Sequence, residues 1–360
     1  MSSSKTSSHT RLAGRTRFYK HVGTTPISPP WETTTATSSR DAIDSPISAG
    51  VDGTNSASGV VVLSTRDYDD DGVQMLHPRN PKTNELLLPY NSSDDDDDDD
   101  DWFGVMLDGK IIKTPLGTNL AVPSHVLAWA IAAEWDFQKK LLQPAQMPLM
   151  TLCCTAMDQV SRQPESYKEQ ILRYLSTDTT CYLADPSEDR ILHNKQQQAW
   201  TGLHDYCQAL LQARPSLAMG TTEGVIMSRS RRAVVSQRTR QQGGSGLPHP
   251  PELILRAKQW VDTLDAWHLT ALHSVASDSK SFLVGMALVL SSYDDDDDSA
   301  HNNPFRDVTR AVAASRVEEE FQIGCWGLVE GGHDYDRLNC SVQIHAARFL
   351  TGSLAMGKVL

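Results

Sequence analysis

A cluster of charged and aromatic residues near the C-terminal end holds the side chains best suited to chemistry. It consists of Arg316, Glu318, Glu319, Glu320, Gln322, Trp326, His333 and Asp334. Carboxylates and histidines bind metals and transfer protons, so Glu319, His333 and Asp334 are consistent with a metal-dependent hydrolase. Consecutive helical residues point about 100° apart, so the three glutamates cannot share one helix face. The alternative interpretation is a solvated charged face followed by a loop histidine.

Other catalytic signatures are missing from the sequence. It contains no G-x-S-x-G, no H-E-x-x-H and no G-x-G-x-x-G. None of the six cysteines forms a C-x-x-C pair, so neither a thiolate zinc site nor a thioredoxin-type motif is indicated. We expect no cofactor and no metal, and we expect reduced cysteines that pack as small apolar side chains.

The charge of the chain is concentrated in two aspartate runs. Residues 94–101 and 294–298 hold eight and five aspartates, and the formal net charge of the whole chain is −12. The rest of the chain is therefore close to neutral and lacks the basic character of a nucleic-acid binder. The longest apolar stretch, Phe282–Leu290, is shorter than the roughly 20 residues that span a bilayer, so we expect no membrane insertion.

The order of the predicted elements indicates an α+β fold. Asp108-Gly109 between two alternating apolar runs predicts a β-hairpin over 102–116. Ser124 is a plausible N-cap for a following helix, and helical spacing dominates the chain from there on. From Leu253 to Val275 that spacing continues over one long stretch. Strands followed by helices favour a small β-rich domain joined to a larger helical domain over an alternating α/β fold.

Composition divides the chain further. Residues 1–16 are acid-poor and rich in serine and basic residues, which is typical of a transit peptide or a disordered tail. We expect a β-rich domain over 17–121 with a long disordered acidic insertion over about 24–101, in which short strands at Val60–Leu63 and Glu85–Leu88 are conceivable. A helical domain over 122–360 then carries loop insertions near 229–246 and 294–303.

A series of short signatures follows the chain from end to end. In order they are Arg17–Lys20, Leu107–Lys110, Lys113–Pro115, Val122–Ser124, Ala132–Trp135, Met147–Leu149, Thr177–Tyr182, Ser315–Gln322, Trp326–Gly327 and His333–Tyr335. No single signature is specific, but the ordered set resembles the mitochondrial chaperone family that handles the alpha subunit during assembly of the ATP synthase catalytic head. The resemblance covers about 102–360 together with Arg17–Lys20.

The resemblance implies a chaperone of the mitochondrial matrix that catalyses no reaction. Such a protein binds the unassembled alpha subunit, shields its beta-facing surface and releases it into the hexamer; we expect it to be monomeric. An acidic residue of the Glu-rich motif matters in the family, so the resemblance assigns client binding to Glu318, Glu319 or Glu320. We expect Arg316, Gln322, Trp326, His333 and Asp334 to belong to the same site.

Two questions stay open at the level of sequence. Some 80 residues separate Arg17–Lys20 from the hairpin, where the family has a compact β domain, so the pairing of Phe18–His21 with the hairpin is uncertain. Long insertions in surface loops cost little, because the entropy of loop closure grows slowly with length. Besides the chaperone and the hydrolase, a third hypothesis is a structural subunit that remains in a complex.

Overall fold

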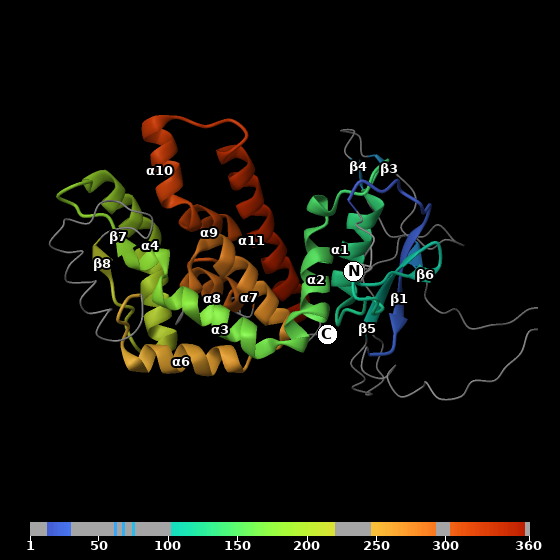
Figure 1. Ribbon diagram of the computed structural model, residues 1–360, viewed down its shortest axis with the longest axis horizontal. Coiled ribbons are helices and arrows are strands. Elements are labelled where there is room, and N and C mark those ends of the chain that lie inside the picture. The colour runs from blue at the N-terminus through green and yellow to red at the C-terminus, as the bar shows by residue number, and fades with distance from the viewer. Residues whose placement is uncertain are drawn as a thin grey trace, which may run out of the picture. The chain divides into compact units, whose positions relative to one another are not determined.

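The computed structural model describes residues 13–29, 61–62, 67–68, 74–75, 102–219, 246–292 and 303–356. The chain divides into two compact units, one of Met1–Cys154 with Met356–Leu360 and one of Thr155–Ala355. The first holds a small sheet and the second is almost entirely helical, which confirms the predicted α+β class (Figure 1). Among the described residues, no helix combines the length and apolar composition needed to cross a bilayer.

The first unit is built on a four-stranded antiparallel sheet. Its strands are β1 (Val22–Ile27), β2 (Val61–Val62), β5 (Trp102–Leu107) and β6 (Lys110–Ile111), in the order β2-β1-β5-β6. Two further short strands, β3 (Asp67–Tyr68) and β4 (Gln74–Met75), pair with each other. Asp108 and Gly109 join β5 to β6 with φ angles of 48° and 80°, which confirms the predicted hairpin turn.

The N-terminal segment reaches the hairpin across the long insertion. Strand β1 pairs with the whole of β5, from Val22 opposite Leu107 to Ile27 opposite Trp102. The carbonyl of His21 accepts a hydrogen bond from the Asp108 amide over 2.9 Å, so the register continues past the strand. The open question about Phe18–His21 is thereby answered: the segment before β1 stays beside the hairpin although some 80 residues intervene.

Several boundaries differ from those expected. Gly14 donates its amide to the Leu142 carbonyl and Thr16 bridges Leu141, so the folded chain begins before residue 17. Strand β1 continues past residue 24, because pairing with β5 orders the chain as far as Ile27. Asn303 is buried and donates to the Tyr206 hydroxyl, so the last loop insertion ends before it. Residues 229–245, 294–302 and the conceivable strand at Glu85–Leu88 lie outside the described part of the chain.

Two helices complete the first unit. Helix α1 (His125–Asp136) is capped by Ser124, as predicted, whose hydroxyl accepts a hydrogen bond from the Leu127 amide. Helix α1 packs against β1 and β5, and α2 (Pro148–Asp158) follows the short 3-10 turn η2 (Pro144–Gln146). The boundary between the two units therefore lies within α2 and not at the expected 121/122, because α1 packs on the sheet of the first unit.

The second unit is a bundle arranged around one buried helix. Its helices are α3 (Pro164–Ser176), α4 (Arg190–Leu211), α6 (Pro251–Asp262), α7 (Ala266–Ser279), α8 (Phe282–Leu290), α9 (Val308–Ser315), α10 (Val317–Trp326) and α11 (His333–Met356). The 3-10 turns η3 (Val160–Arg162) and η4 (Thr179–Cys181) and the parallel strand pair β7 (Tyr182–Leu183) and β8 (Ala218–Met219) complete it. Helix α8 is buried from Phe282 to Val289 and contacts α3, α4, α7 and α9 (Figure 1).

Asp178 fastens a signature turn to this central helix. Its buried carboxylate accepts hydrogen bonds from the amide and the hydroxyl of Thr180, over 3.0 and 2.7 Å, and from the Leu283 amide over 2.9 Å. Burial raises the pKa of this carboxyl above its usual value. The carboxylate thus accepts hydrogen bonds from backbone amides at the start of both η4 and α8. These bonds give the acidic residue of this turn a structural role.

Candidate functional site

The candidate residues lie at the two ends of a helical hairpin. Arg316 stands between α9 and α10, the three glutamates form the first turn of α10, and Trp326 is its last residue. His333 and Asp334 begin α11, and a short loop joins the two helices (Figure 1). Trp326 lies seven positions after Glu319 along the helix, a rise of roughly 10 Å. The candidates therefore form a base around Arg316 and a tip around Trp326.

The base is an ion-pair network that we call the clamp, made of Arg316, Glu319, Glu320 and Arg337. The Arg316 guanidinium is buried and donates to Glu319 over 2.7 Å and to Glu320 over 3.3 Å. Arg337, from α11, pairs with both oxygens of Glu320, through its Nε over 2.8 Å and through its Nη2. Hydrogen bonds from Arg337 and then Arg316 hold the pKa of Glu320 below its usual value. The clamp thus joins α10 to α11.

Glu318 points to a different neighbour. Its Oε1 accepts a hydrogen bond from the Gln196 side chain over 2.6 Å, and Gln196 in turn accepts one from the Ala184 amide over 2.7 Å. Glu318 therefore ties α10 to α4, whereas Glu319 and Glu320 turn toward Arg316. The three glutamates do not share one face, as expected from their helical spacing.

The tip exposes apolar side chains. We call the set Trp326, Leu328, Val329, Tyr335 and Leu338 the tip surface; all five are exposed, Trp326 to 81%. None of the ten residues of α10 is buried. His333 stabilises the connecting loop, because its Nδ1 accepts a hydrogen bond from the Val329 amide over 3.0 Å. Gln322 and Asp334 are exposed to solvent.

The geometry gives the hydrolase hypothesis no metal centre. Within the ranges that the structure describes, no group of three His, Cys, Asp or Glu side chains could hold a metal ion. Glu319 pairs with Arg316 at the base, whereas His333 bonds to the Val329 amide at the tip. The three residues of that hypothesis are thus not brought together.

Two members of the site are absent from the sequence prediction. Arg337 and Gln196 contact Glu320 and Glu318 from other helices. Neither residue stands in a recognisable motif, and their role depends on how α4 and α11 lie beside α10. No local signal in the sequence could have identified them.

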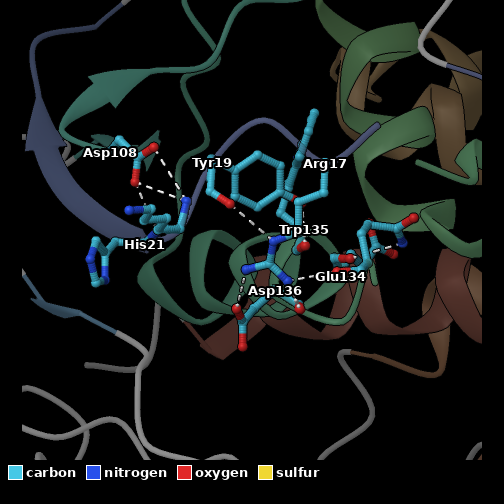
Figure 2. A network of polar contacts seen from close by, with 9 residues as sticks. Arg17, Tyr19, His21, Asp108, Glu134, Trp135 and Asp136 are labelled. Atoms are coloured by element: carbon cyan, nitrogen blue, oxygen red, sulfur yellow. Dashed lines mark hydrogen bonds and ion pairs between the residues drawn. The ribbon is translucent and has the colours of Figure 1, made fainter. Parts of the chain in front are cut away.

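The signatures of the first unit meet in a second polar network, shown in Figure 2. Arg17 donates to the carbonyls of Asp136 and Gln138, over 2.9 and 2.6 Å, and to the Asp136 carboxylate over 3.0 Å. The Tyr19 hydroxyl donates to the Trp135 carbonyl over 2.6 Å, and burial raises its pKa to about 12. The Asp108 carboxylate accepts from the amides of Lys20 and His21.

Glu134 extends this network to α2. Its carboxylate accepts hydrogen bonds from the amides of Leu149 and Met150, over 2.7 and 2.8 Å. Burial raises the pKa of Glu134 to about 7, although the two amide bonds act in the opposite direction. The signatures at Arg17–Lys20, Leu107–Lys110, Ala132–Trp135 and Met147–Leu149 therefore build one scaffold, which explains why they occur together.

Comparison with known proteins agrees with this architecture. The family model described as ATP12 chaperone protein matches residues 90–208. The mitochondrial protein ATP12 of Saccharomyces cerevisiae is 27% identical over 264 residues, covering 68% of this chain and 76% of the yeast protein. The mitochondrial protein atp12 of Schizosaccharomyces pombe is 25% identical over 255 residues, covering 69% of this chain and 76% of its own.

Solved structures show the same similarity. The crystal structure of Atp12 from Paracoccus denitrificans superposes with a TM-score of 0.54 at 26% identity, covering 70% of this chain and 91% of that one. Fold and sequence together define the class as an α+β chaperone protein. The chain is similar to ATP12 chaperone proteins over about two thirds of its length, in agreement with the ordered signatures. The family model ends before Arg316, so the residues of the clamp and the tip lie outside its match.

Proposed function

We propose that this protein is a chaperone for the unassembled alpha subunit of ATP synthase in the mitochondrial matrix. It binds the alpha subunit, shields its beta-facing surface, and releases it during assembly of the catalytic head. It acts as a monomer without cofactor, catalyses no reaction, and neither inserts into the membrane nor binds nucleic acid. The match to the ATP12 family model and the similarity to mitochondrial ATP12 proteins support this proposal.

The observation that carries the proposal is the exposed helical hairpin. An unassembled subunit presents an apolar interface that favours aggregation. A protein that covers such an interface and then releases it needs an apolar contact with a polar rim. Helix α10 has no buried residue, its last side chain is the exposed Trp326, and its first turn carries three carboxylates.

Among the three glutamates we propose that Glu319 faces the client. Its side chain is 54% exposed, whereas that of Glu320 is 40% exposed and lies between two arginines. Glu318 is half-buried and bonds to Gln196. Glu319 can therefore exchange or share its partner Arg316 with a basic group of the client at the smallest structural cost. Arg316, Glu318 and Glu320 position the hairpin, and Gln322, Trp326, His333 and Asp334 lie along the same client-facing segment.

The experiment compares two charge reversals in the full chain. Glu319→Lys should reduce capture of the unassembled alpha subunit from mitochondrial extract by about tenfold or more, which a lost charge pair of about 1.4 kcal/mol would produce. Glu169→Lys is the matched control, because Glu169 also pairs with an arginine near it on a helix, Arg173, four residues away on an exposed face. Its capture of the alpha subunit should not change.

Two outcomes would contradict the proposal. If the unaltered chain fails to capture the alpha subunit, the function is wrong. If instead the chain copurifies in fixed stoichiometry with mature ATP synthase, it is a structural subunit and not a chaperone. Unchanged capture by Glu319→Lys would remove only the role assigned to Glu319.

A further inference from the structure

We propose that the tip surface is the docking site for the client and selects an apolar segment flanked by lysine or arginine. The inference rests on the proposed function, because it assigns that segment to the alpha subunit. It separates two roles within the hairpin: the tip surface makes the central contact, and Arg316, Glu320 and Arg337 of the clamp hold the tip surface in place.

The side chains of the tip surface are of the kind that dominates protein interfaces. Trp326 is 81% exposed, Tyr335 65% and Leu338 63%, and Leu328 and Val329 between them are also exposed. Tyr335 and Leu338 stand three residues apart on α11 and so lie on one helix face. Tryptophan and tyrosine contribute disproportionately to binding when a partner buries them. The two aromatic and three aliphatic side chains thus lie within thirteen positions of the sequence, and the protein itself buries none of them.

The hairpin is packed at its base and open at its tip. No residue of α10 is buried, and the first buried residue of α11 is Cys340, two turns after the helix begins. Beyond it Ile344, Ala347 and Leu350 are buried, as expected for a helix that packs on its unit. The exposed part of α11 thus coincides with the part that carries Tyr335 and Leu338, and this boundary marks the extent of the docking surface.

The charge around the tip surface specifies the partner. Glu330, Asp334 and Asp336 are exposed beside its apolar residues. The only arginines of the hairpin between 316 and 338 are Arg316 and Arg337, and both pair with glutamates of the clamp. The rim of the tip surface is therefore acidic. Complementary potentials favour a partner with basic residues next to its apolar contact and disfavour an acidic one.

The loop at the tip is already ordered without a partner. Gly327 ends α10 at a φ of 91°, with its amide bonded to the Ile323 carbonyl over 2.8 Å. The Val329 carbonyl accepts the amides of Gly332 and His333, and the Val329 amide donates to His333. A contact surface that is ordered in advance loses less conformational entropy when it binds. This arrangement favours recognition by the tip as it stands in the free protein.

The test measures the affinity of the purified alpha subunit for the full chain. Trp326→Ala combined with Tyr335→Ala should weaken binding by roughly 10- to 100-fold, as expected for two central aromatic contacts. The matched control is Leu255→Ala on α6, an apolar side chain that is 56% exposed elsewhere in the same unit. Because all three side chains are exposed, circular dichroism and the unfolding midpoint should stay unchanged in every variant.

A second variant tests the charge of the rim. Glu330→Lys, Asp334→Lys and Asp336→Lys together should weaken binding at low salt and remove the loss of affinity that the unaltered chain shows as salt rises. Unchanged affinity in the aromatic variant, or an unchanged salt dependence in the charge variant, would overturn the inference while leaving the chaperone function in place. Failure of the unaltered chain to bind the alpha subunit would overturn both.

Discussion

The two polar networks of this protein use the same kinds of residues for opposite purposes. In the first unit, Arg17 and Asp136 are each about 15% exposed, and Arg17 also donates to two backbone carbonyls. In the second unit, Arg316 is more deeply buried, at 6% exposed, but its partners Glu319 and Glu320 are half-exposed and begin a helix, α10, without buried residues. The first network satisfies backbone carbonyls at the end of α1, whereas the second holds the exposed first turn of α10.

The difference lies in what the arginine satisfies. Backbone carbonyls at the end of α1 would lose hydrogen bonds if Arg17 were removed, so that network mainly contributes to folding. Carboxylates on the exposed first turn of α10 would instead become solvated, so the clamp contributes little to folding and mainly sets the position of the hairpin. Substitutions in the first network should therefore change stability, and substitutions in the clamp should change binding.

The largest effect is expected for Arg17→Met. The substitution leaves the carbonyls of Asp136 and Gln138 without their donor, and the Asp136 carboxylate without its partner, so the free energy of unfolding should fall by about 2–3 kcal/mol. Urea denaturation of the full chain measures this. Arg15→Met is the control, because the Arg15 side chain is exposed and only its backbone pairs with Leu142. Equal losses in both variants would contradict the stabilising role of Arg17.

A smaller effect, dependent on pH, is expected from Glu134. Its pKa of about 7 in the folded protein lies above the ordinary value of 4.5, so the folded state binds the proton more tightly. Its contribution to stability is therefore fully present below about pH 4.5 and is lost as the pH rises through about 7. Glu134→Gln should remove this decline, which is of the order of 1–3 kcal/mol.

The measurement compares unfolding free energies of the two proteins between pH 4.5 and 7.5. The difference between the unaltered chain and Glu134→Gln should shift steadily across this interval. Glu188→Gln alters an exposed glutamate and should show no such shift. A pH-independent difference for Glu134→Gln would mean that the carboxyl is already ionised throughout the range.

The smallest change in stability is expected in the clamp. Arg337→Met removes a partly exposed partner of Glu320 and should leave the unfolding midpoint almost unchanged, because solvent screens an exposed ion pair. Binding of the alpha subunit should nevertheless fall several-fold, because α11 is no longer held to α10. Titration with purified alpha subunit measures this fall. If Arg337→Met lost as much stability as Arg17→Met and kept its affinity for the alpha subunit, the proposed difference between the two networks would be wrong.

Local sequence predicted the elements whose causes are local. Asp108-Gly109 specifies its turn because both residues adopt positive φ. Ser124 caps α1 because its hydroxyl accepts a hydrogen bond from the amide three residues further along the chain. The helical spacing from Leu253 to Val275 was predicted correctly in type but not in continuity. Two helices share it, and Asp265 caps the second through the amides of Trp267 and His268.

The pairings over long distances could not be predicted in this way. The partner of Arg17 is more than a hundred residues away, and the partner of Glu318 is 122 residues away. For the Glu-rich segment, the sequence indicated a site without indicating which glutamate turns outward. That choice depends on Arg316, which pairs with Glu319 and Glu320, and on Arg337, which pairs with Glu320. These contacts form only once α9, α10 and α11 have packed.

By itself, the sequence determined the class of fold, the β-hairpin, the Ser124 cap and the family resemblance, because each is encoded in neighbouring residues or in the order of short signatures. Only the tertiary structure decided that strand β1 pairs with β5 although the long insertion separates them in sequence. It also decided that Glu319 and Glu320 pair with arginines and that the side chains of the tip surface stay exposed. The physical reason is that exposure and ion pairing are properties of packed elements. The sequence around a tryptophan at the end of a helix does not show whether neighbouring elements bury its side chain or leave it exposed to a partner.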